Sequence, residues 1–515
     1  MLWRLTRDVP GFVRRPLDLE GARRLVCLAL DTRQQRFLDL VDRAVYGDER
    51  SPYRRLLAHA GCERGDLHAL VAAEGVEGAL RSLADRGVYV TFDELKGRRP
   101  IVRGSTRVAV ADRDFDSPLA RGHLTTYTSG SGGRPTRVLR SLDLLTDGAS
   151  TFSLALEAHG IRNPRTTLWL GGSPSWMVIY LKLGHPIDAW FYPIRPLPGL
   201  AHLGARYLSA LTGLGGRRLP PPVYCGLLEP ETIATWLADR VGHGRPVLLS
   251  TTTSAAVRVA VAASELGRSL AGVALHCRSE PLTAARRRLI ERAGLQTVLD
   301  YGSMELPYVG FGCPATAGPD DVHLSRHLFA ATVRRRRLLA GAPAVDALLL
   351  TSLSPAAAKV ALNVELGDSA RIEEKDCGCL LGELGLRTHL SEIRSFEKLS
   401  TEGTSFACSN VVEILEELLP ARFGGSALDY QLVEEELAAS GATRLSLRVH
   451  PAVGPLDEAA VRSTLLAALG RGGIVDTYQA NLIRHAGSIV VVRRTPLATP
   501  AGKVLPFHLA RRTGR

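Results

Sequence analysis

The chain has 515 residues, of which 45% are hydrophobic and 23% charged, and its formal net charge at pH 7 is +12. This length exceeds one compact core, so about two to four domains are expected, and the ordinary apolar fraction excludes a disordered or low-complexity protein. The sequence has no run of roughly 20 apolar residues that would span a membrane, and its start lacks the apolar core of a secretion signal. We therefore expect a cytoplasmic protein with mostly reduced cysteines.

The positive charge is spread along the chain and is almost entirely arginine, because only six lysines occur. Short basic runs, at 286–288 and 334–337, are typical of solvated faces rather than of a nucleic-acid footprint. We expect no nucleic-acid and no membrane partner, and only a weak general attraction for small anions.

The predicted elements change character along the chain. Apolar residues recur at three- and four-residue spacing over 19–45 and 52–86, which predicts helices. From about Thr125, the strand-like runs TTLWLGG, VLLS, VALHC and TVLDYG alternate with amphipathic stretches such as 254–266 and 281–293, which favours a layered α/β sheet. Beyond about Lys398, helix-like segments over 411–419 and 456–469 accompany the strand-like runs RLSLRVH and SIVVVRR.

These changes predict three parts. Residues 1–110 form a helical segment, residues 111–397 form the core of a large α/β domain, and residues 398–515 form a small α+β domain.

A loop rich in glycine and hydroxyl residues follows the first strand-like run. Between Thr128 and Thr136 it holds three glycines, two serines and two threonines. Such a loop can turn backbone N–H groups and hydroxyls toward a phosphate, although it matches neither the P-loop nor the GxGxxG dinucleotide loop. By composition alone, a flexible surface loop is an equally good interpretation.

The loop TSGSGGRPT resembles the TSGSTGxPK signature of the adenylate-forming (ANL) superfamily. Within that superfamily it is most similar to the SSGTTGKPT loop of phenylacetate-CoA ligases and related acyl-protein synthetases. LDYGSMELPYVGFGCP resembles the YGxTE motif, ALNVELGDSARI resembles RYRTGD, and IRSFEKL resembles GRxDDxI. HCRSEPLTAARRR resembles the GGEPLT turn, and TPLATPAGKVLPF lies where the family keeps its catalytic lysine. The resemblance covers about residues 51–507.

This resemblance implies a large layered α/β domain with a helical N-terminal segment, followed by a small mobile α+β domain. It implies ATP-dependent adenylation of a small carboxylic acid, with an aryl acid favoured, and transfer of the acyl group to CoA, a carrier-protein thiol or an amine. Two alternatives stay open: activation of a different oxyanion or direct amide formation on the same fold, and a catalytically weakened nucleotide-binding scaffold. The scaffold reading is supported by departures from the family motifs at Gly132, Thr136, Met304 and Asn363.

The resemblance also implies roles for individual residues. Tyr301 would stack on adenine, Asp368 would bind the ribose hydroxyls, and Glu305 would hold Mg²⁺. Lys503 would neutralise charge on the α-phosphate, and Glu397 with Lys398 would form the domain hinge. The other implied nucleotide-binding residues are Thr128, Ser129, Gly130, Ser131, Gly132, Gly133, Arg134, Thr136, Ser279, Glu280, Gly302, Ser303 and Arg394.

Substrate selectivity is the least defined part of the sequence. Trp176, Tyr180, Ser254 and Cys277 are candidate pocket residues by their placement in the family's acid-binding segments. For Trp176 and Tyr180, the spacing fits a core position better than a ligand contact. A homodimer is a further candidate assembly.

The cysteines carry a separate signal. Cys377 and Cys379 form a close pair, and Cys313 and His323 lie upstream of it. Three thiolates and one imidazole make a closed tetrahedral site, which is typical of structural zinc, and relatives of the phenylacetate-CoA-ligase type often carry Cys and His at these places. Free buried cysteines are the alternative.

Overall fold

The computed structural model describes residues 2–127, 136–171, 174–193, 199–280, 282–316, 318–337, 344–395, 398–401, 404–407, 411, 414–426, 429–436, 443–471, 480–481, 483–497 and 507–509. Thr128 to Arg134 of the phosphate loop, Glu397 of the hinge and Lys503 lie outside these ranges, so their roles stay predictions. Within the ranges, no helix is long and apolar enough to cross a membrane.

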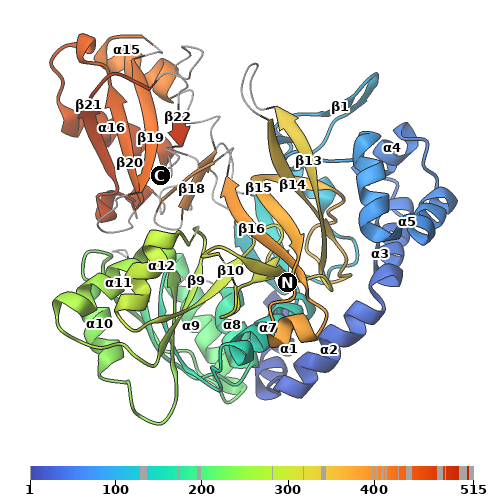
Figure 1. Cartoon of the computed structure of the whole chain (residues 1–515), viewed down its shortest axis with the longest axis horizontal. Helices are drawn as coiled ribbons and strands as arrows, with labels where there is room; N and C mark the ends of the chain where they lie inside the picture. The colour runs from blue at the N-terminus through green and yellow to red at the C-terminus, as the bar shows by residue number, and fades with distance from the viewer. Residues whose placement is uncertain are drawn as a thin grey trace.

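The N-terminal segment consists of helices that wrap along one side of the molecule (Figure 1). Helix α1 packs on α9, α2 on α7, and α5 on β13. The predicted helix over 19–45 is divided at Thr32, whose φ and ψ of −97° and 12° are not helical. The elements are α1 (Leu2–Arg14), α2 (Leu19–Asp31), α3 (Arg33–Val41), the π-helix η1 (Asp42–Tyr46), α4 (Pro52–His59), α5 (Arg64–Asp85), α6 (Phe92–Leu95), β1 (Ile101–Arg103), β2 (Thr106–Val108) and the 3₁₀ helix η2 (Asp112–Phe115).

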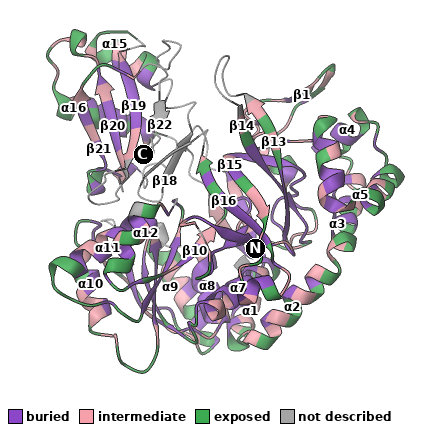
Figure 2. Cartoon of the chain, viewed as in Figure 1, coloured by how far each residue is buried: buried purple, intermediate pink, exposed green. Residues whose placement is uncertain are grey.

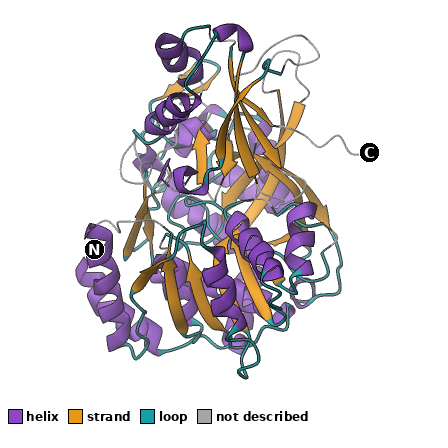
Figure 3. Ribbon diagram, turned by 90° about the vertical axis from the view of Figure 1, so that its left-hand side faces the viewer, coloured by secondary structure: helices purple, strands orange, loops and turns teal. Residues whose placement is uncertain are grey.

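A hairpin then leads into the parallel half of the main sheet. The hairpin is β3 (Leu124–Tyr127) and β4 (Arg137–Arg140), and residues 128–136 connect its strands. The helices and strands that follow alternate: α7 (Leu142–Ala158), β5 (Arg165–Trp169), α8 (Pro174–Lys182), β6 (Ile187–Tyr192), α9 (Gly199–Leu214), β7 (Pro222–Tyr224), α10 (Pro230–Ala238), β8 (Val247–Thr252), α11 (Thr253–Glu265), β9 (Val273–Arg278), α12 (Ala284–Arg292) and β10 (Gln296–Tyr301). Helices cover both faces of these strands (Figure 3), which is why the strands are near-continuous apolar runs.

The strand order of the parallel half is β10-β9-β8-β5-β6-β7. The chain builds outward from β5 to β7, then returns to place β8 beside β5 and continues to β10. This reversal between β5 and β8 is a switch point, and ligands of doubly wound sheets bind beyond the carboxyl ends of the strands there.

An antiparallel half extends the same sheet, so that the order continues β11-β12-β16-β15-β14-β13 beyond β10. Strand β10 joins the halves, because it pairs with β9 in parallel and with β11 antiparallel. The elements are β11 (Gly310–Phe311), β12 (Val322–Leu324), β13 (Phe329–Arg337), β14 (Ala344–Ser352), β15 (Val364–Glu374), α13 (Leu380–Glu383) and β16 (Thr388–Ser395). One hydrophobic core runs from Leu5 to Ile393 and also includes Ala486.

The C-terminal part has a hydrophobic cluster of its own, from Val411 to Val491, visible as a second group of buried residues in Figure 2. Its four strands are ordered β21-β20-β19-β22. The elements are β17 (Lys398–Thr401), β18 (Thr404–Ala407), the π-helix η3 (Ile414–Leu418), α15 (Leu419–Phe423), β19 (Tyr430–Glu436), β20 (Thr443–Val449), the 3₁₀ helix η4 (Pro451–Val453), α16 (Glu458–Leu469), β21 (Ile489–Arg493) and β22 (Phe507–Leu509). The two strands and the helix over 456–469 that the sequence predicts are therefore confirmed.

Candidate active site

Three neighbouring parallel strands end at the same edge of the sheet. They are β8, β9 and β10, which end at Thr252, Arg278 and Tyr301. The segments that follow these ends carry several of the residues predicted to bind nucleotide or acid, namely Ser254, Ser279, Glu280, Gly302 and Ser303. The fold therefore gathers at one edge residues that lie as much as 49 positions apart in the sequence, from Ser254 to Ser303.

Tyr301 and Asp368 meet across the two halves of the sheet. The Tyr301 hydroxyl donates a hydrogen bond of 3.0 Å to Oδ2 of Asp368 in β15. Burial, together with the neighbouring Asp368 carboxylate, raises the pKa of Tyr301 well above its ordinary value of 10. The phenol therefore stays protonated and remains a donor at neutral pH. The two residues that the resemblance assigns to the adenosine moiety are thus in direct contact.

Glu280 organises the amino end of α11. Its Oε2 accepts a hydrogen bond of 2.7 Å from the backbone N–H of Ser254, and Nη1 of Arg286 lies 3.9 Å from the same oxygen. Nη2 of Arg286 lies 3.4 Å from the Ser254 hydroxyl. The other carboxylate oxygen, Oε1, is buried and finds no hydrogen-bond partner among the described residues. This unsatisfied acceptor is free to receive a donor from a ligand.

The candidate pocket residues fall into two groups. Ser254 and Cys277 belong with Glu280 and are 2% and 0% exposed, and burial raises the pKa of the Cys277 thiol to about 12. Trp176 and Tyr180 lie on α8 in an aromatic cluster with Phe152, Tyr308, Phe311 and His276. Both α8 residues are buried, so the structure gives them core positions and their contact with a substrate stays a prediction.

His276 and Asp300 are buried polar residues of the strands that the sequence analysis did not single out. Nδ1 of His276 lies 2.6 Å from the Tyr180 hydroxyl, and its Nε2 lies 3.6 Å from Oδ2 of Asp300. Burial lowers the pKa of His276, against the opposing effect of Asp300. In the sequence, His276 interrupts the apolar run VALHC, and Asp300 interrupts the run TVLDYG. A buried polar side chain in a strand requires a partner, so these two interruptions could have indicated the pair.

Glu305 has a protein cation as its partner. Its carboxylate forms an ion pair with Nζ of Lys96, which follows α6, and each side chain is 6% exposed. Buried Arg140 donates to the Met304 carbonyl. Burial lowers the pKa of Arg140, and Tyr308 and Glu305 act in the opposite direction. A Mg²⁺ ion bound at Glu305 would therefore lie beside the Lys96 ammonium and be repelled by it. In this arrangement the Glu305 carboxylate does not fit the role of a Mg²⁺ ligand.

Arg394 does not join the Tyr301–Asp368 pair. Its Nη1 donates to Oδ2 of Asp320 at 2.5 Å. In the register of β15 and β16, Asp368 faces Ser395 and Ser369 faces Arg394. Because side chains alternate between the faces of a sheet, Arg394 lies on the opposite face from Asp368. A nucleotide contact of Arg394 stays a prediction, and it would require the ion pair to open.

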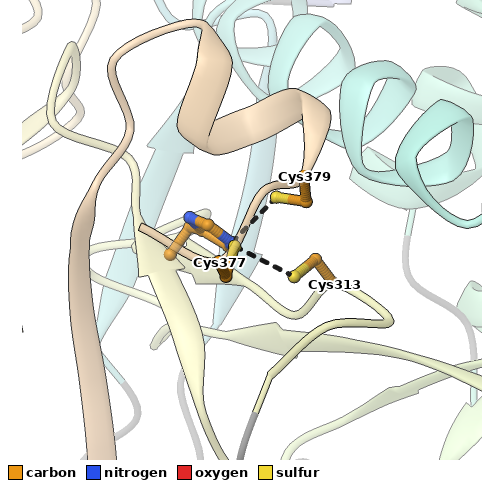
Figure 4. Close-up of side chains that lie close together, drawn as sticks. Cys313, Cys377 and Cys379 are labelled. Atoms are coloured by element: carbon orange, nitrogen blue, oxygen red, sulfur yellow. Dashed lines mark hydrogen bonds between the residues drawn. The ribbon is translucent and has the colours of Figure 1, made fainter. Parts of the chain in front are cut away.

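Four metal-ligand side chains converge beside β12 in the antiparallel half of the sheet, as the sequence predicted. The ligand atoms of Cys313, His323, Cys377 and Cys379 all lie within 4.8 Å of one another, and Figure 4 shows the three thiols turned toward one centre. Nδ1 of His323 donates to the Leu386 carbonyl at 2.5 Å, so Nε2 is the nitrogen that faces the thiols. Hydrogen bonding, mainly from the Cys313 thiol and also from His323, lowers the pKa of Cys379, which favours a thiolate.

A doubly wound parallel sheet continued by antiparallel strands, with a small α+β unit after it, is the arrangement expected for the ANL fold. No protein-family model matches the chain, and neither does any curated protein sequence. Among solved structures, 2-hydroxyisobutyryl-CoA ligase with bound 2-HIB-AMP and CoA aligns over 96% of this chain and 91% of its own, with 15% identity and a TM-score of 0.54. The amide bond synthetase McbA from Marinactinospora thermotolerans aligns over 97% and 98%, with 14% identity and a TM-score of 0.43. The fold predicted from the motifs is confirmed by the first of these.

Proposed function

We propose that this chain is an ATP-dependent ligase that converts a small carboxylic acid to an acyl-adenylate and then passes the acyl group to a thiol or an amine. The observation that carries the proposal is the Tyr301–Asp368 hydrogen bond of 3.0 Å beside the carboxyl end of β10. It supplies an aromatic ring for adenine and a carboxylate that can accept hydrogen bonds from ribose hydroxyls. The unsatisfied Oε1 of Glu280 is an acceptor suited to the exocyclic amine of adenine.

The substrates of such a ligase are an acid and an acceptor for the acyl group. An aryl acid is the candidate that the sequence favours, and CoA is the first acceptor to test because the neighbouring ligase has been captured with an acyl-AMP and CoA. A carrier-protein thiol and an amine are the other acceptors. We further propose that the enzyme works in the cytoplasm, and light scattering would show whether it is a homodimer.

ATP–pyrophosphate exchange across a panel of aryl, hydroxy and aliphatic acids tests the proposal. At least one acid should support exchange, and Asp368→Asn should raise the ATP concentration needed for half-maximal rate by about tenfold, because one charge-assisted hydrogen bond contributes roughly 1.5 kcal/mol. Tyr430→Phe is the matched control, since that tyrosine hydroxyl bonds the Gly424 carbonyl in the C-terminal part. Binding of ATP without exchange for any acid would favour the scaffold reading.

We also propose that Cys313, His323, Cys377 and Cys379 hold one structural zinc. A tetrahedral zinc with thiolate and imidazole ligands places sulfur atoms about 3.8 Å apart and sulfur about 3.6 Å from nitrogen, given the usual bond lengths. The Cys313–Cys377 separation is 3.8 Å, and Nε2 of His323 lies 3.5 Å from Cys377 and 3.3 Å from Cys379. Four protein ligands leave no open position, so the ion would stabilise these loops rather than take part in catalysis.

Metal analysis of protein purified without added zinc tests this assignment. One equivalent of zinc is expected, and Cys377→Ser should lose it and lower the unfolding temperature. Cys27→Ser is the control, because Cys27 lies on α2 and is not one of the four clustered residues. A stable, monodisperse wild type with a metal content near zero would contradict the proposal.

A further inference from the structure

Two buried polar side chains with unused hydrogen-bonding atoms lie side by side in the carboxyl halves of β9 and β10. Nε2 of His276 lies 3.6 Å from Oδ2 of Asp300, which is too long for a hydrogen bond. Neither Nε2 of His276 nor Oδ1 of Asp300 has a hydrogen-bond partner within the described part of the chain. The His276 side chain is fully buried, and that of Asp300 is 9% exposed. Because buried polar atoms are normally satisfied, these two atoms indicate that a further polar group joins them.

The surroundings of His276 determine which hydrogen bonds it can make. Burial lowers the pKa of His276 and raises the pKa of Tyr180, so the imidazole is neutral and the phenol is protonated at neutral pH. The Tyr180 hydroxyl can then donate to Nδ1 of His276, 2.6 Å away, which leaves the imidazole proton on Nε2, beside the Asp300 carboxylate. Nε2 is therefore a donor and Oδ1 of Asp300 an acceptor. A hydroxyl group, which both accepts and donates, satisfies the two atoms together.

Both side chains lie on one face of the sheet, close to the edge that carries the candidate active site. His276 pairs with Val298 in the register of β9 and β10. Val298 and Asp300 are two residues apart on β10, so these three side chains share a face, and Tyr301 lies on the other. His276 precedes Arg278, the last residue of β9, by two residues, or about 7 Å. A ligand that enters at this edge would reach His276 over about the length of one aromatic ring.

Aromatic rings pack around His276 on that face. The ring centroids of Phe152 in α7 and Trp176 in α8 lie 4.5 Å and 4.4 Å from that of His276. The ring of Tyr308 lies 5.4 Å from that of Trp176. Flat apolar surfaces of this kind favour contact with a further aromatic ring. A ring that carries a hydroxyl therefore matches both the aromatic surroundings and the two unsatisfied atoms.

We propose that His276 and Asp300 determine which acid the enzyme accepts, and that the substrate is a hydroxy-substituted aryl acid whose ring hydroxyl binds between them. The hydroxyl accepts a hydrogen bond from the Nε2–H of His276 and donates one to Oδ1 of Asp300. This inference rests on the proposed function, because it concerns the acid that is adenylated. Benzoate would leave both atoms unsatisfied, and a methoxybenzoate could accept from His276 but could not donate to Asp300.

ATP–pyrophosphate exchange by the full-length protein with benzoate, the three hydroxybenzoates and the corresponding methoxybenzoates tests the proposal. At least one hydroxybenzoate should have a kcat/KM that exceeds those of benzoate and of its own methoxy analogue by about tenfold or more, because a site that hydrogen-bonds a hydroxyl rejects analogues that lack it. If benzoate is used as well as every hydroxybenzoate, the two atoms are satisfied by a buried water only, and the inference is overturned.

His276→Phe removes the donor and keeps an aromatic ring. The kcat/KM for the preferred hydroxybenzoate should fall by about tenfold or more, whereas that for benzoate should stay within about threefold and the KM for ATP should not change. The matched control is His159→Phe, which replaces another buried histidine, one whose Nδ1 bonds the Ala155 carbonyl at the end of α7. Equal losses for benzoate and the hydroxybenzoate in His276→Phe would show a purely structural role and overturn the inference.

Asp300→Asn changes the direction of selectivity, which loss of folding cannot do. The amide can donate to a methoxy oxygen, so the preference for the hydroxybenzoate over its methoxy analogue should fall by about tenfold or more, and thermal unfolding would confirm that the variant is folded. An unchanged preference would count against Asp300 as the acceptor and overturn the inference. Exchange with aliphatic acids or benzoate alone overturns the inference and leaves the proposed function intact, whereas exchange with no acid of any class overturns both.

Discussion

Two residues that replace the arginines of the RYRTGD motif in this chain, Asn363 and Glu365, have structural roles of their own. Asn363 is fully buried, and its Nδ2 donates to the carbonyls of Leu80 at 2.8 Å and Val88 at 3.1 Å. Glu365 is fully buried and pairs with Arg334 and Arg336 of β13. Where the family pattern has arginines, this chain therefore has residues that join its N-terminal helical segment and β13 to β15. These two departures do not by themselves indicate a loss of nucleotide binding.

Asn363 provides a stability prediction. Its φ of 51° lies in the left-handed region, which glycine tolerates without strain. Asn363→Gly should therefore lose only the side-chain bonds, which lowers the free energy of unfolding by about 1–3 kcal/mol because two buried carbonyls lose their donor. Asn363→Ala should lose more, since alanine adds backbone strain. Urea unfolding measures both, with exposed Gln34→Ala as the control, and an unchanged midpoint for Asn363→Gly would refute the anchoring role.

Individual strands could be predicted from the sequence, whereas side-chain contacts between distant elements could not. Strands β5, β8, β9 and β10 could be predicted because a strand covered by helices on both faces is a continuous apolar run. The break at Thr32 could not, since the apolar spacing continues through it. The Tyr301–Asp368 contact joins residues 67 positions apart and was reached only by resemblance to known motifs. The Lys96–Glu305 pair spans 209 positions and carried no local signal.

A buried histidine between elements makes stability depend on pH. His327 precedes β13, and its Nε2 lies 3.0 Å from the Thr151 hydroxyl of α7. Burial, reinforced by Arg36 and Arg33 of α3, lowers the pKa of His327 to about 3. The folded protein therefore keeps this imidazole neutral at pH values where the unfolded chain, with a pKa near 6.5, binds a proton. The corresponding stability is complete above about pH 6.5 and is lost progressively as the pH falls toward 3.

Replacing His327 should flatten this dependence. Between pH 6 and 4.5, His327→Gln should lose about 1–2 kcal/mol less unfolding free energy than the wild type, because each proton taken up only by the unfolded chain contributes about 1.4 kcal/mol per pH unit. Urea unfolding at several pH values measures the slope. His59→Gln is the control, since His59 is an exposed residue bonded to Thr106. Parallel slopes for wild type and His327→Gln would show that His327 titrates normally in the folded protein.

At the scale of the whole molecule, the chain has two hydrophobic clusters, which lie on opposite sides of the predicted hinge at Glu397 and Lys398 except for Ala486, which packs with the larger cluster. Separate cores allow two units to move relative to each other without exposing either interior. The residues assigned to adenosine, Tyr301 and Asp368, both belong to the large unit. Lys503 lies in the C-terminal part of the sequence, so the predicted catalytic cation and the nucleotide-binding residues would be carried by different units.

This separation predicts that Lys503 affects one half-reaction only. Adenylation adds negative charge at the α-phosphate in the transition state, so a positioned ammonium lowers the barrier more than it tightens ATP binding. Lys503→Ala should therefore reduce acid-dependent ATP–pyrophosphate exchange by about two to three orders of magnitude. ATP affinity measured by calorimetry should change little, because the other predicted contacts lie on the large unit.

The second half-reaction provides the control for Lys503. When it is started from supplied acyl-AMP, transfer to the acceptor should proceed at close to the wild-type rate in Lys503→Ala, because no charge then develops in the attack on ATP. An equal loss in both half-reactions would point to misfolding of the C-terminal unit, which thermal unfolding would reveal. No loss in either would show that Lys503 is a solvated residue near the chain end. The adenylation step would then need another cation near the α-phosphate.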